Sequence, residues 1–430
     1  MNPSTLVVVC GLSAAALFIP RKKVYIPLLL SACFLAVEDG IDIAGMYFPG
    51  YRLVLIAALI RILVRREITF KDHTGILRII VIWAIYSLFA YTVLYGSFSA
   101  FIMQGRKALD AIGLFLIFHS TVKDIDDVHD ILAFYTLLVI PIALAMLYES
   151  RTGVSVFSIL GDAPKLSSFR GEDVRAQGPF RHAILAGAFG ATSMSIIVSC
   201  FWNPKIPKWR VVGGLMAATA ITITSHSSGG LIVYVVCLAG LSIWKYRTNM
   251  RLFRWMVVAI LGFLIVIMNA PIWFIFARLS GIFGGTGWHR AELLNGAFGR
   301  YFSEWWLIGT TYTRHWMPYG VPSSPSHSDI TNQFLAVGVD GGFLSMLLFI
   351  WIIVLSFKRV GYALAKAGDS LETRTIWALG VSLAGHTAAF MSVPYFDQIV
   401  VHWYLLLAMI NVAVPHINSI KKVENKIIIR

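Results

Sequence analysis

The chain has 430 residues and a formal net charge of +14; 57% of its residues are hydrophobic, only 13% are charged, and its mean hydropathy is +0.73. These values exclude an ordinary soluble domain of this length. Apolar runs of about 20 residues, the length that crosses a bilayer core, recur from end to end.

The predicted fold is all-α, because a segment in lipid must satisfy its backbone groups internally. We expect one polytopic membrane domain over residues 1–430, with about 12 or 13 transmembrane helices. In chain order, the apolar segments cover 3–20, 24–37, 47–63, 75–96, 102–119, 130–148, 182–202, 211–225, 231–244, 253–277, 333–357, 375–393 and 398–415. The second and ninth are short, so they could be tilted, re-entrant or longer than the apolar run.

Basic residues cluster in alternate connections between these segments. Twelve lysines and twelve arginines fall there: Arg21, Lys22, Lys23, Arg61, Arg65, Arg66, Lys71, Arg78, Lys123, Lys205, Lys208, Arg210, Lys245, Arg247, Arg251, Arg254, Lys358, Arg359, Lys366, Arg374, Lys421, Lys422, Lys426 and Arg430. Cytoplasmic connections carry such an excess. The pattern predicts a cytoplasmic C-terminus, and it explains the net charge without a nucleic-acid partner.

Two connections, 149–181 and 278–330, are too long to be simple turns, and the charge pattern places both on the outer face. Long loops in compact folds usually carry function. Arginine, which binds phosphate or carboxylate through two parallel hydrogen bonds, outnumbers lysine on this face, so we expect an anionic ligand, with phosphate favoured. The basic residues there are Arg52, Arg106, Lys107, Arg151, Lys165, Arg170, Arg175, Arg181, Arg278, Arg290, Arg300 and Arg314.

The simpler alternative is that these arginines contact lipid headgroups or pair with acidic residues. The acidic residues available in the two connections are Glu149, Asp162, Glu172, Asp173, Glu292 and Glu304. For any single arginine, headgroup contact or ion pairing is favoured over binding of an anionic ligand.

A transfer reaction on the outer face needs a donor already carried by a lipid, because ATP and nucleotide sugars are cytoplasmic. A glycan on a polyprenyl diphosphate is such a donor, and arginines that stabilise the diphosphate charge make it a good leaving group. The acceptor hydroxyl then needs a base active near neutral pH, which is a property of histidine. This chemistry requires no metal.

Three motifs lie in or beside the two connections. Arg181 begins a span and is followed, after three residues, by Leu185; His327-Ser328 is followed, after nine residues, by Gly338-Val-Asp-Gly341. The stretch GWHRAELLNGAFGRYFSEWWLIGT (287–310) is an arginine-led amphipathic segment followed by an apolar-Gly turn. In this order the motifs resemble those of the O-antigen ligase and polymerase superfamily of bacterial membrane proteins.

The resemblance implies a glycosyltransferase of the bacterial inner membrane that uses no metal or cofactor. Its donor would be a polyprenyl-diphosphate-linked oligosaccharide, and its acceptor a saccharide or a lipid A core. It implies that Arg181 and Arg290 bind the diphosphate and that His327 orients or deprotonates the acceptor. Arg175 and Arg300 are further diphosphate-binding candidates by position. The family often has a Ser-Arg pair where this chain has SHSSGG, so His226 receives no role.

His327 also has a simpler interpretation, as an interfacial histidine near a helix start. Ser326 or Ser328 would cap that helix, with Asp329 in its first turn. This explains the serines and Asp329 but not the histidine, so we favour the functional role. Asp329 is a second base candidate, or it orients His327.

Further expectations concern side-chain placement. Asp329, Gln333, Ala336 and Asp340 would share one helix face, and Asp340 would pair with a neighbouring helix. Arg290 would face water or ligand, opposite the apolar side of an amphipathic helix. Interface belts would explain most of the tryptophans in the second connection, which are Trp288, Trp305, Trp306 and Trp316.

The motifs do not separate a polymerase, which joins repeat units, from a ligase, which moves finished glycan to a lipid A core. A transporter or flippase of lipid-linked glycan is the alternative from another class, and it would place basic residues deep inside several spans. A sensor or scaffold is a weaker third option.

Overall fold

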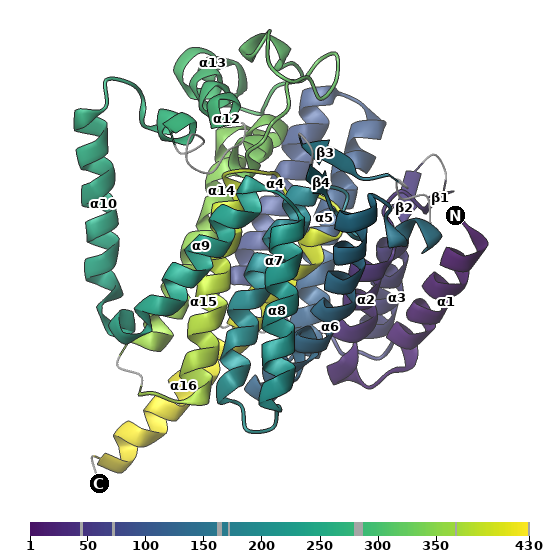
Figure 1. The fold of residues 1–430 in the computed structure, drawn as a ribbon, viewed down its shortest axis with the longest axis vertical. Coiled ribbons are helices and arrows are strands. Elements are labelled where there is room, and N and C mark those ends of the chain that lie inside the picture. The colour runs from purple at the N-terminus through teal and green to yellow at the C-terminus, as the bar shows by residue number, and fades with distance from the viewer. Residues whose placement is uncertain are drawn as a thin grey trace.

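The computed structural model of the protein describes residues 1–430 apart from 44–45, 71–73, 161–165, 171–172, 279–286, 366–367 and 429–430. Among the residues discussed above, those outside the described part are Lys71, Asp162, Lys165, Glu172, Lys366 and Arg430. The described chain is mostly helical, and its long helices form a bundle (Figure 1).

Each expected apolar segment contains one helix. These helices are α1 (Pro3–Phe18), α2 (Tyr25–Phe34), α3 (Gly50–Val64), α4 (Ile76–Tyr95), α5 (Phe98–Thr121), α6 (Ile125–Thr152), α7 (Ala183–Val198), α8 (Lys208–Thr224), α9 (Ser228–Ser242), α10 (Met250–Ile267), α14 (Gln333–Leu364), α15 (Leu371–Phe390) and α16 (Ile399–Ile428). Short 3-10 helices join them at η1 (Arg21–Lys23), η2 (Val156–Leu160), η3 (Ser199–Trp202), η4 (Ile243–Asn249) and η5 (Ile272–Phe274).

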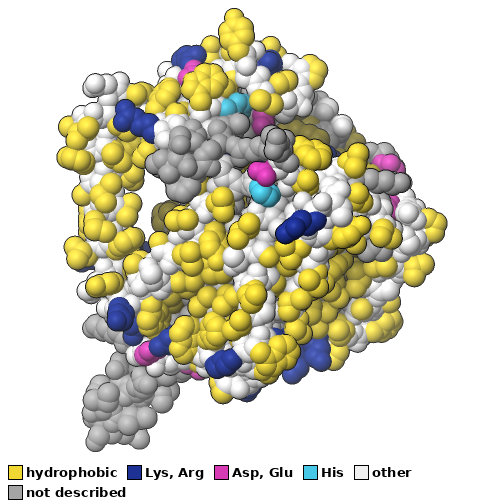
Figure 2. Space-filling view, in the orientation of Figure 1, with side chains coloured by type: hydrophobic (Ala, Val, Ile, Leu, Met, Phe, Trp, Pro, Cys, Tyr) yellow, Lys and Arg dark blue, Asp and Glu magenta, His cyan; other side chains and the backbone are white. Residues whose placement is uncertain are grey.

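Several of these helices could span a membrane. Within the described residues, five helical stretches are long and apolar enough: Ile76–Tyr95, Ile125–Thr152, Ala183–Trp202, Ser228–Ile267 and Gln333–Leu364. Figure 2 shows the matching surface, which is broadly apolar along the bundle with Lys and Arg side chains near its lower end. The total number of spans stays a prediction.

Local sequence explains where many helices begin and end. The side chains of Ser97, Asp124 and Ser370 accept hydrogen bonds from backbone N–H groups in the first turns of α5, α6 and α15. Gly96 and Gly153, both with left-handed φ, end α4 and α6.

The start of α14 differs from the expectation. The cap is Asn332, whose side chain accepts from Leu335 N at 3.0 Å, and not Ser326 or Ser328. His327 and Asp329 therefore lie in the loop before the helix. Their backbone groups are already used within this loop, because Asp329 N donates to Val321 O at 2.8 Å and His327 O accepts from the N–H groups of 323 and 324.

Helix α7 forms the centre of the apolar core, with nearly all of its residues buried against α8, α9 and α15. A Cβ on Gly187 would lie 3.1 Å from the Cα of Gly230 in α9, so the two helices approach closely there. Helix α10 stands apart from the bundle in Figure 1 and has no buried residue.

Two hairpins and a helical cap lie outside the long helices. The hairpins pair β1 (Gly40–Ile43) with β2 (Met46–Pro49) and β3 (Ser168–Arg170) with β4 (Asp173–Arg175). The cap contains α12 (Gly287–Leu294), the π-helical η6 (Asn295–Arg300), α13 (Phe302–Trp305) and η7 (Arg314–Trp316).

The cap has a small apolar core that it shares with the start of α14. It consists of Leu293, Ala297, Trp305, Trp316, Met317, Leu335, Val339 and Met346. Trp305 and Trp316 are fully buried in it, while Trp288 and Trp306 are exposed. The interface-belt expectation is therefore wrong for two of the four tryptophans, because the cap is large enough to bury them.

Both long connections lie toward one end of the bundle. In Figure 1, α12, α13 and the β3–β4 hairpin lie toward the upper end, while the C-terminus lies at the lower end. The Met1 ammonium lies 3.5 Å from the carboxylate of Asp39, next to the β1–β2 hairpin. The two chain termini are therefore well separated along the bundle.

Candidate functional site

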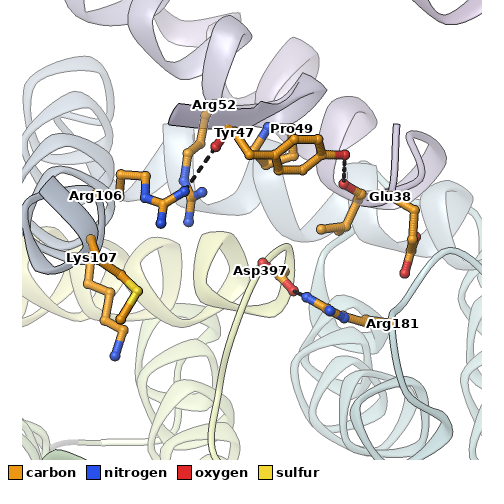
Figure 3. Close-up of a pocket in the computed structure, with 10 residues that line it drawn as sticks. Glu38, Tyr47, Pro49, Arg52, Arg106, Lys107, Arg181 and Asp397 are labelled. Carbon is orange, nitrogen blue, oxygen red and sulfur yellow. Dashed lines mark hydrogen bonds and ion pairs between the residues drawn. The ribbon is translucent and has the colours of Figure 1, made fainter. Parts of the chain in front are cut away.

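A cleft with an excess of basic side chains lies beside the β1–β2 hairpin (Figure 3). Its volume is about 460 Å³. The charged residues that line it, which define the cationic cleft, are Arg52, Arg106, Lys107, Arg181, Glu38 and Asp397. Four basic groups against two carboxylates leave the lining with a net positive charge.

The cleft brings together parts of the chain that are distant in sequence. Arg52 lies in the first turn of α3, and Arg106 and Lys107 lie in the third turn of α5. Arg181 and Asp397 each lie two residues before a helix, α7 and α16 respectively. Three of these five residues, Arg52, Arg181 and Asp397, therefore lie at or just before helix starts, and the other two lie within α5.

Arg52 is fixed in the cleft by a buried carboxylate. Its Nε and Nη2 donate to both oxygens of Asp110 in α5, at 2.8 to 3.1 Å, and Tyr51 Oη donates to the same carboxylate at 3.2 Å. A bidentate pair of this kind orients the planar guanidinium.

Two other cations of the cleft are held more loosely. Lys107 Nζ donates to Asp340 of α14 at 2.5 Å, and its side chain is half exposed. Arg181 Nη1 donates to Asp397 at 3.3 Å while 59% of the Arg181 side chain remains exposed. Exposed pairs of this kind contribute little to stability, so both groups are available to an incoming anion.

Arg106 and Asp397 complete the lining. Arg106 Nη1 donates to a neutral group, the backbone carbonyl of Tyr47, at 3.2 Å. Asp397 has a left-handed φ of 57°, which is uncommon for a residue other than glycine. The fold holds this strained residue between the arginines, a feature that clusters at functional sites.

The first connection is pinned so that Arg181 reaches the cleft. The buried carboxylate of Glu149, at the end of α6, accepts from Ser167 Oγ at 2.8 Å and from the backbone N–H groups of Gln177 and Gly178 at 3.0 Å. Gln398 Nε2 donates to Pro179 O at 2.8 Å. These bonds fix the chain on the approach to Arg181.

A second cavity of about 320 Å³ adjoins the cleft and shares Arg52, Lys107 and Asp397 with it. We call it the aromatic chamber, because its wall includes Trp83, Phe349, Phe390, Tyr395, Phe396, Trp403 and Tyr404. Gln333, Ala336 and Asp340 also line it. The expected polar face of α14 is therefore confirmed for these three residues, and the pairing of Asp340 with a neighbouring helix is confirmed by Lys107.

His327 is half-buried in its loop, where its Nδ1 lies 3.2 Å from Thr313 Oγ1. Partial burial lowers its pKa, and the nearby Asp340 carboxylate opposes this shift. The ring is therefore largely neutral at pH 7. Asp340 lies close enough to act on His327 electrostatically, and it pairs with Lys107 of the cleft.

The group that contacts Nδ1 of the His327 ring is the hydroxyl of Thr313, not the carboxylate of Asp329. The Asp329 backbone O lies 2.9 Å from His289 Nε2, which ties the loop to α12. Its carboxylate interacts electrostatically with His182, next to Arg181. The base role of Asp329 stays a prediction.

The remaining arginine candidates have other environments. Arg290 is buried, 8% exposed, so it does not face water as expected, while a ligand contact stays a prediction. The physical reason is that most of α12 is buried, including His289, Ala291 and Leu293. Arg300 forms an ion pair with Glu292, as the simpler alternative expects. Arg175 lies half-buried in β4.

None of Arg175, Arg290 and Arg300 lines the cationic cleft or the aromatic chamber. Of the four diphosphate-binding candidates, the structure places only Arg181 in the cationic cleft. Two more acidic residues of the connections pair with histidines: Asp173 with His226 at 3.5 Å, and Glu304 with His315 at 2.8 Å.

The glycines of the histidine motif have a packing role. A Cβ on Gly338 would lie 2.6 Å from the ring of Trp305, and a Cβ on Gly341 would lie 2.8 Å from the Cβ of Ser345. The next residue, Gly342, has a φ of 77° and passes the carbonyl of Leu307 closely. Phe343 N donates to Trp306 O at 2.8 Å, and Thr310 N donates to Val339 O at 3.0 Å. The apolar-Gly turn of the cap thus pairs with α14 at a break in that helix.

Sequence reasoning did not single out Arg52, Arg106, Lys107, Asp110 and Asp397 as site residues. A signal was present, because Asp110 and Asp340 are acidic residues within apolar helices and such residues usually have a partner. What the sequence lacked was the pairing of helices that brings their cations together.

No protein-family model matches this chain, and a search of curated proteins finds no significant relative.

Proposed function

We propose that the protein is a membrane glycosyltransferase of the O-antigen ligase and polymerase type, acting on the outer face of the bacterial inner membrane. The observation that carries this proposal is the cationic cleft, where Arg181 of the sequence motif lies with Arg52, Arg106 and Lys107. Guanidinium groups match the geometry of phosphate oxygens. The ligand would be the diphosphate of a polyprenyl-diphosphate-linked oligosaccharide.

In the proposed reaction, an acceptor hydroxyl oxygen attacks the anomeric carbon of the donor. The bond between this carbon and the diphosphate oxygen breaks, and the polyprenyl diphosphate leaves with the bonding electrons. The cations of the cleft stabilise the negative charge that develops on the leaving group. The acceptor is a saccharide or a lipid A core.

His327 is the proposed base. With Nδ1–H donating to Thr313 Oγ1, Nε2 can accept the proton of the acceptor hydroxyl. The lowered pKa keeps the ring neutral near pH 7, as a base must be before the reaction. His327 lies on the cap, and the cleft lies between long helices, so donor and acceptor would approach from different sides.

The positions of two cleft cations favour an enzyme over a transporter. A transporter would need basic groups along a path through the spans, whereas Arg52 lies in the first turn of α3 and Arg181 lies just before α7. Arg106 and Lys107 lie further along, in the third turn of α5. The clusters of Lys and Arg in alternate connections of the sequence support a cytoplasmic C-terminus. Figure 2 shows Lys and Arg side chains near the lower end of the bundle and also near its upper end.

Deleting the gene in the source organism tests the proposal. Accumulation of single lipid-linked units would identify a polymerase, and accumulation of unattached polymer would identify a ligase. Unchanged surface polysaccharide together with unchanged lipid-linked intermediates would overturn the assignment. Complementation with His327→Ala should fail although the variant protein reaches the membrane in normal amount.

A further inference from the structure

Two arginines and two tryptophans, which we call the Trp–Arg cluster, meet where η4 joins α9 to α10. The guanidinium carbons of Arg247 and Arg374 lie 4.2 Å and 5.2 Å from the ring centroid of Trp244 in η4. Arg374, near the start of α15, also lies over the ring of Trp202, at 4.1 Å. The Trp244 ring contacts the buried ring of Trp377 edge-on, at 6.0 Å. These contacts orient both guanidinium groups.

The cluster carries more positive charge than the described residues neutralise. Arg374 is paired with Asp369, since its Nε donates to Asp369 Oδ1 at 2.5 Å. The pKa of Asp369 is lowered, chiefly by this hydrogen bond and to a smaller extent by the charge of Arg247. The described residues include no hydrogen-bond or salt-bridge partner for the Arg247 side chain. One carboxylate between two guanidinium groups leaves Arg247 available to a further anion.

The chain around the cluster is basic and borders an apolar helix. Lys245, Arg247, Arg251 and Arg254 lie in η4 and the start of α10, and residues 243–254 include no acidic residue. Lys and Arg next to a membrane span attract anionic lipids, and interfacial tryptophans lie at the level of the headgroups. The cluster therefore has the composition of a phospholipid headgroup site.

Helix α10 leaves space for acyl chains beside the cluster. It has no buried residue, and its main contacts are with η4 and η5 at its two ends. Figure 2 shows an opening between this helix and the rest of the molecule, with apolar side chains along the helix. Hydrocarbon chains match such a surface, because they cover apolar side chains without exposing them to water.

We propose that the Trp–Arg cluster binds the headgroup of an anionic phospholipid, whose acyl chains occupy the space between α10 and the bundle. The phosphate oxygens accept hydrogen bonds from the free guanidinium of Arg247, and Arg374 adds positive charge beside them. The lipid belongs to the leaflet that the sequence predicts to be cytoplasmic. The cluster shares no residue with the cationic cleft, so this inference does not depend on the proposed function.

Native mass spectrometry of the full-length protein, delipidated in detergent, tests the inference. The probes are phosphatidylglycerol and phosphatidylethanolamine with identical acyl chains, because only the first carries a net negative charge. We expect the wild-type protein to bind phosphatidylglycerol more tightly. Arg247→Ala should reduce the affinity for phosphatidylglycerol by about 10-fold, the effect of one hydrogen bond to a charged group, and so remove most of the preference.

Arg254→Ala is the matched control, because it removes the same charge from an exposed position near the start of α10. It should keep the preference. Arg247→Lys retains the charge but not the planar fork, so it should also bind phosphatidylglycerol more weakly than the wild type. The inference is overturned if the wild type or Arg254→Ala shows no preference, or if Arg247→Ala or Arg247→Lys binds phosphatidylglycerol like the wild type.

A competition experiment separates a lipid headgroup from a soluble phosphate. Inorganic phosphate should displace no more phosphatidylglycerol than sodium chloride of the same ionic strength does. Specific displacement by phosphate would overturn the lipid assignment and identify the cluster as a site for a soluble phosphate. Either result leaves the proposed function untouched, because that function depends on the cationic cleft.

Discussion

The two long connections look alike in sequence, but the structure uses them differently. The first, which contains Arg181, is short of apolar residues and is pinned by polar bonds to Glu149, and it delivers an exposed guanidinium to the cationic cleft. The second folds around Trp305 and Trp316 and buries Arg290. The comparison teaches that two arginines with similar positions in their motifs can differ in burial: Arg181 is exposed and available to an anion, whereas Arg290 is buried.

The largest expected effect is on catalysis, at Arg181. Arg181→Ala should reduce glycan transfer by about 10²- to 10³-fold, the usual effect of deleting one group that stabilises transition-state charge. The measurement is the initial rate with purified protein, a lipid-linked donor and a saccharide acceptor. Because the side chain is 59% exposed, the thermal unfolding midpoint should hardly change.

Arg151→Ala is the matched control, since Arg151 is exposed in the same connection but does not line the cleft. It should keep close to full activity. Equal losses of activity in both variants would show that any positive charge in this connection supports transfer, whether or not it lines the cleft. The contrast between the two connections would then weaken.

At Arg290, the expected effect is on stability. Arg290→Ala removes a large buried side chain and should lower the free energy of unfolding by about 2–4 kcal/mol. Denaturant unfolding in detergent, monitored by tryptophan fluorescence, measures this change. Arg300→Ala, which breaks a half-exposed ion pair, should cost no more than about 1 kcal/mol.

The opposite outcome at Arg290 would be informative. A variant with normal stability but no transfer activity would restore Arg290 as a diphosphate-binding residue. In that case, the cap would have to present this arginine to the substrate in another conformation.

The contact between the cap and α14 can be tested at a glycine. Gly342→Ala places a Cβ against the Leu307 carbonyl at a φ of 77° and should lower the free energy of unfolding by about 1–3 kcal/mol. Gly361→Ala, in the same helix but with open space around it, should be neutral or slightly stabilising. Similar unfolding midpoints for the two variants would contradict the break in α14.

The pH dependence of transfer tests the role of His327. The reactive form is the neutral ring, so activity should be full above its pKa and fall as the pH drops through it. Because the pKa is lowered from its ordinary value of about 6.5, the midpoint of the loss should lie below that pH. His327→Gln should be much less active, and its remaining activity should no longer fall at low pH. If the activity of the variant falls at low pH as that of the wild type does, another group is responsible for the pH dependence.

Much of the fold follows from the sequence. All thirteen apolar segments contain helices, because apolar runs of this length have few other ways to satisfy their backbone. The start of α14 could not be predicted, since Ser326, Ser328 and Asn332 are all good caps. Which of them caps the helix depends on backbone hydrogen bonds between residues 321–324 and 327–329. No local sequence pattern predicts these hydrogen bonds.

The site was predictable only in part. A motif identified Arg181, but its neighbours in the cleft come from α3 and α5, and their grouping depends on how helices pack. Arg290 was expected to face water or ligand, because a short amphipathic pattern cannot show that most residues of α12, and not only its apolar side, are buried in the cap. Long-range packing, and not residue type, was the missing information.

The smallest expected effect is at Thr313, which lies on the cap beside the proposed base. Thr313→Val removes the partner of His327 Nδ1 and should slow transfer by about 3- to 10-fold, the effect of one hydrogen bond. Thr313 Oγ1 also accepts from Ser328 N at 3.1 Å, so Thr313 holds both the ring of His327 and the backbone next to it. The loss should therefore appear in kcat and in the acid limb of the pH profile, with little change in donor KM. Thr313→Ser retains the hydroxyl and should behave like the wild type. If the serine variant is as slow as the valine variant, the methyl group rather than the hydrogen bond positions the ring, and the cap would hold His327 by packing alone.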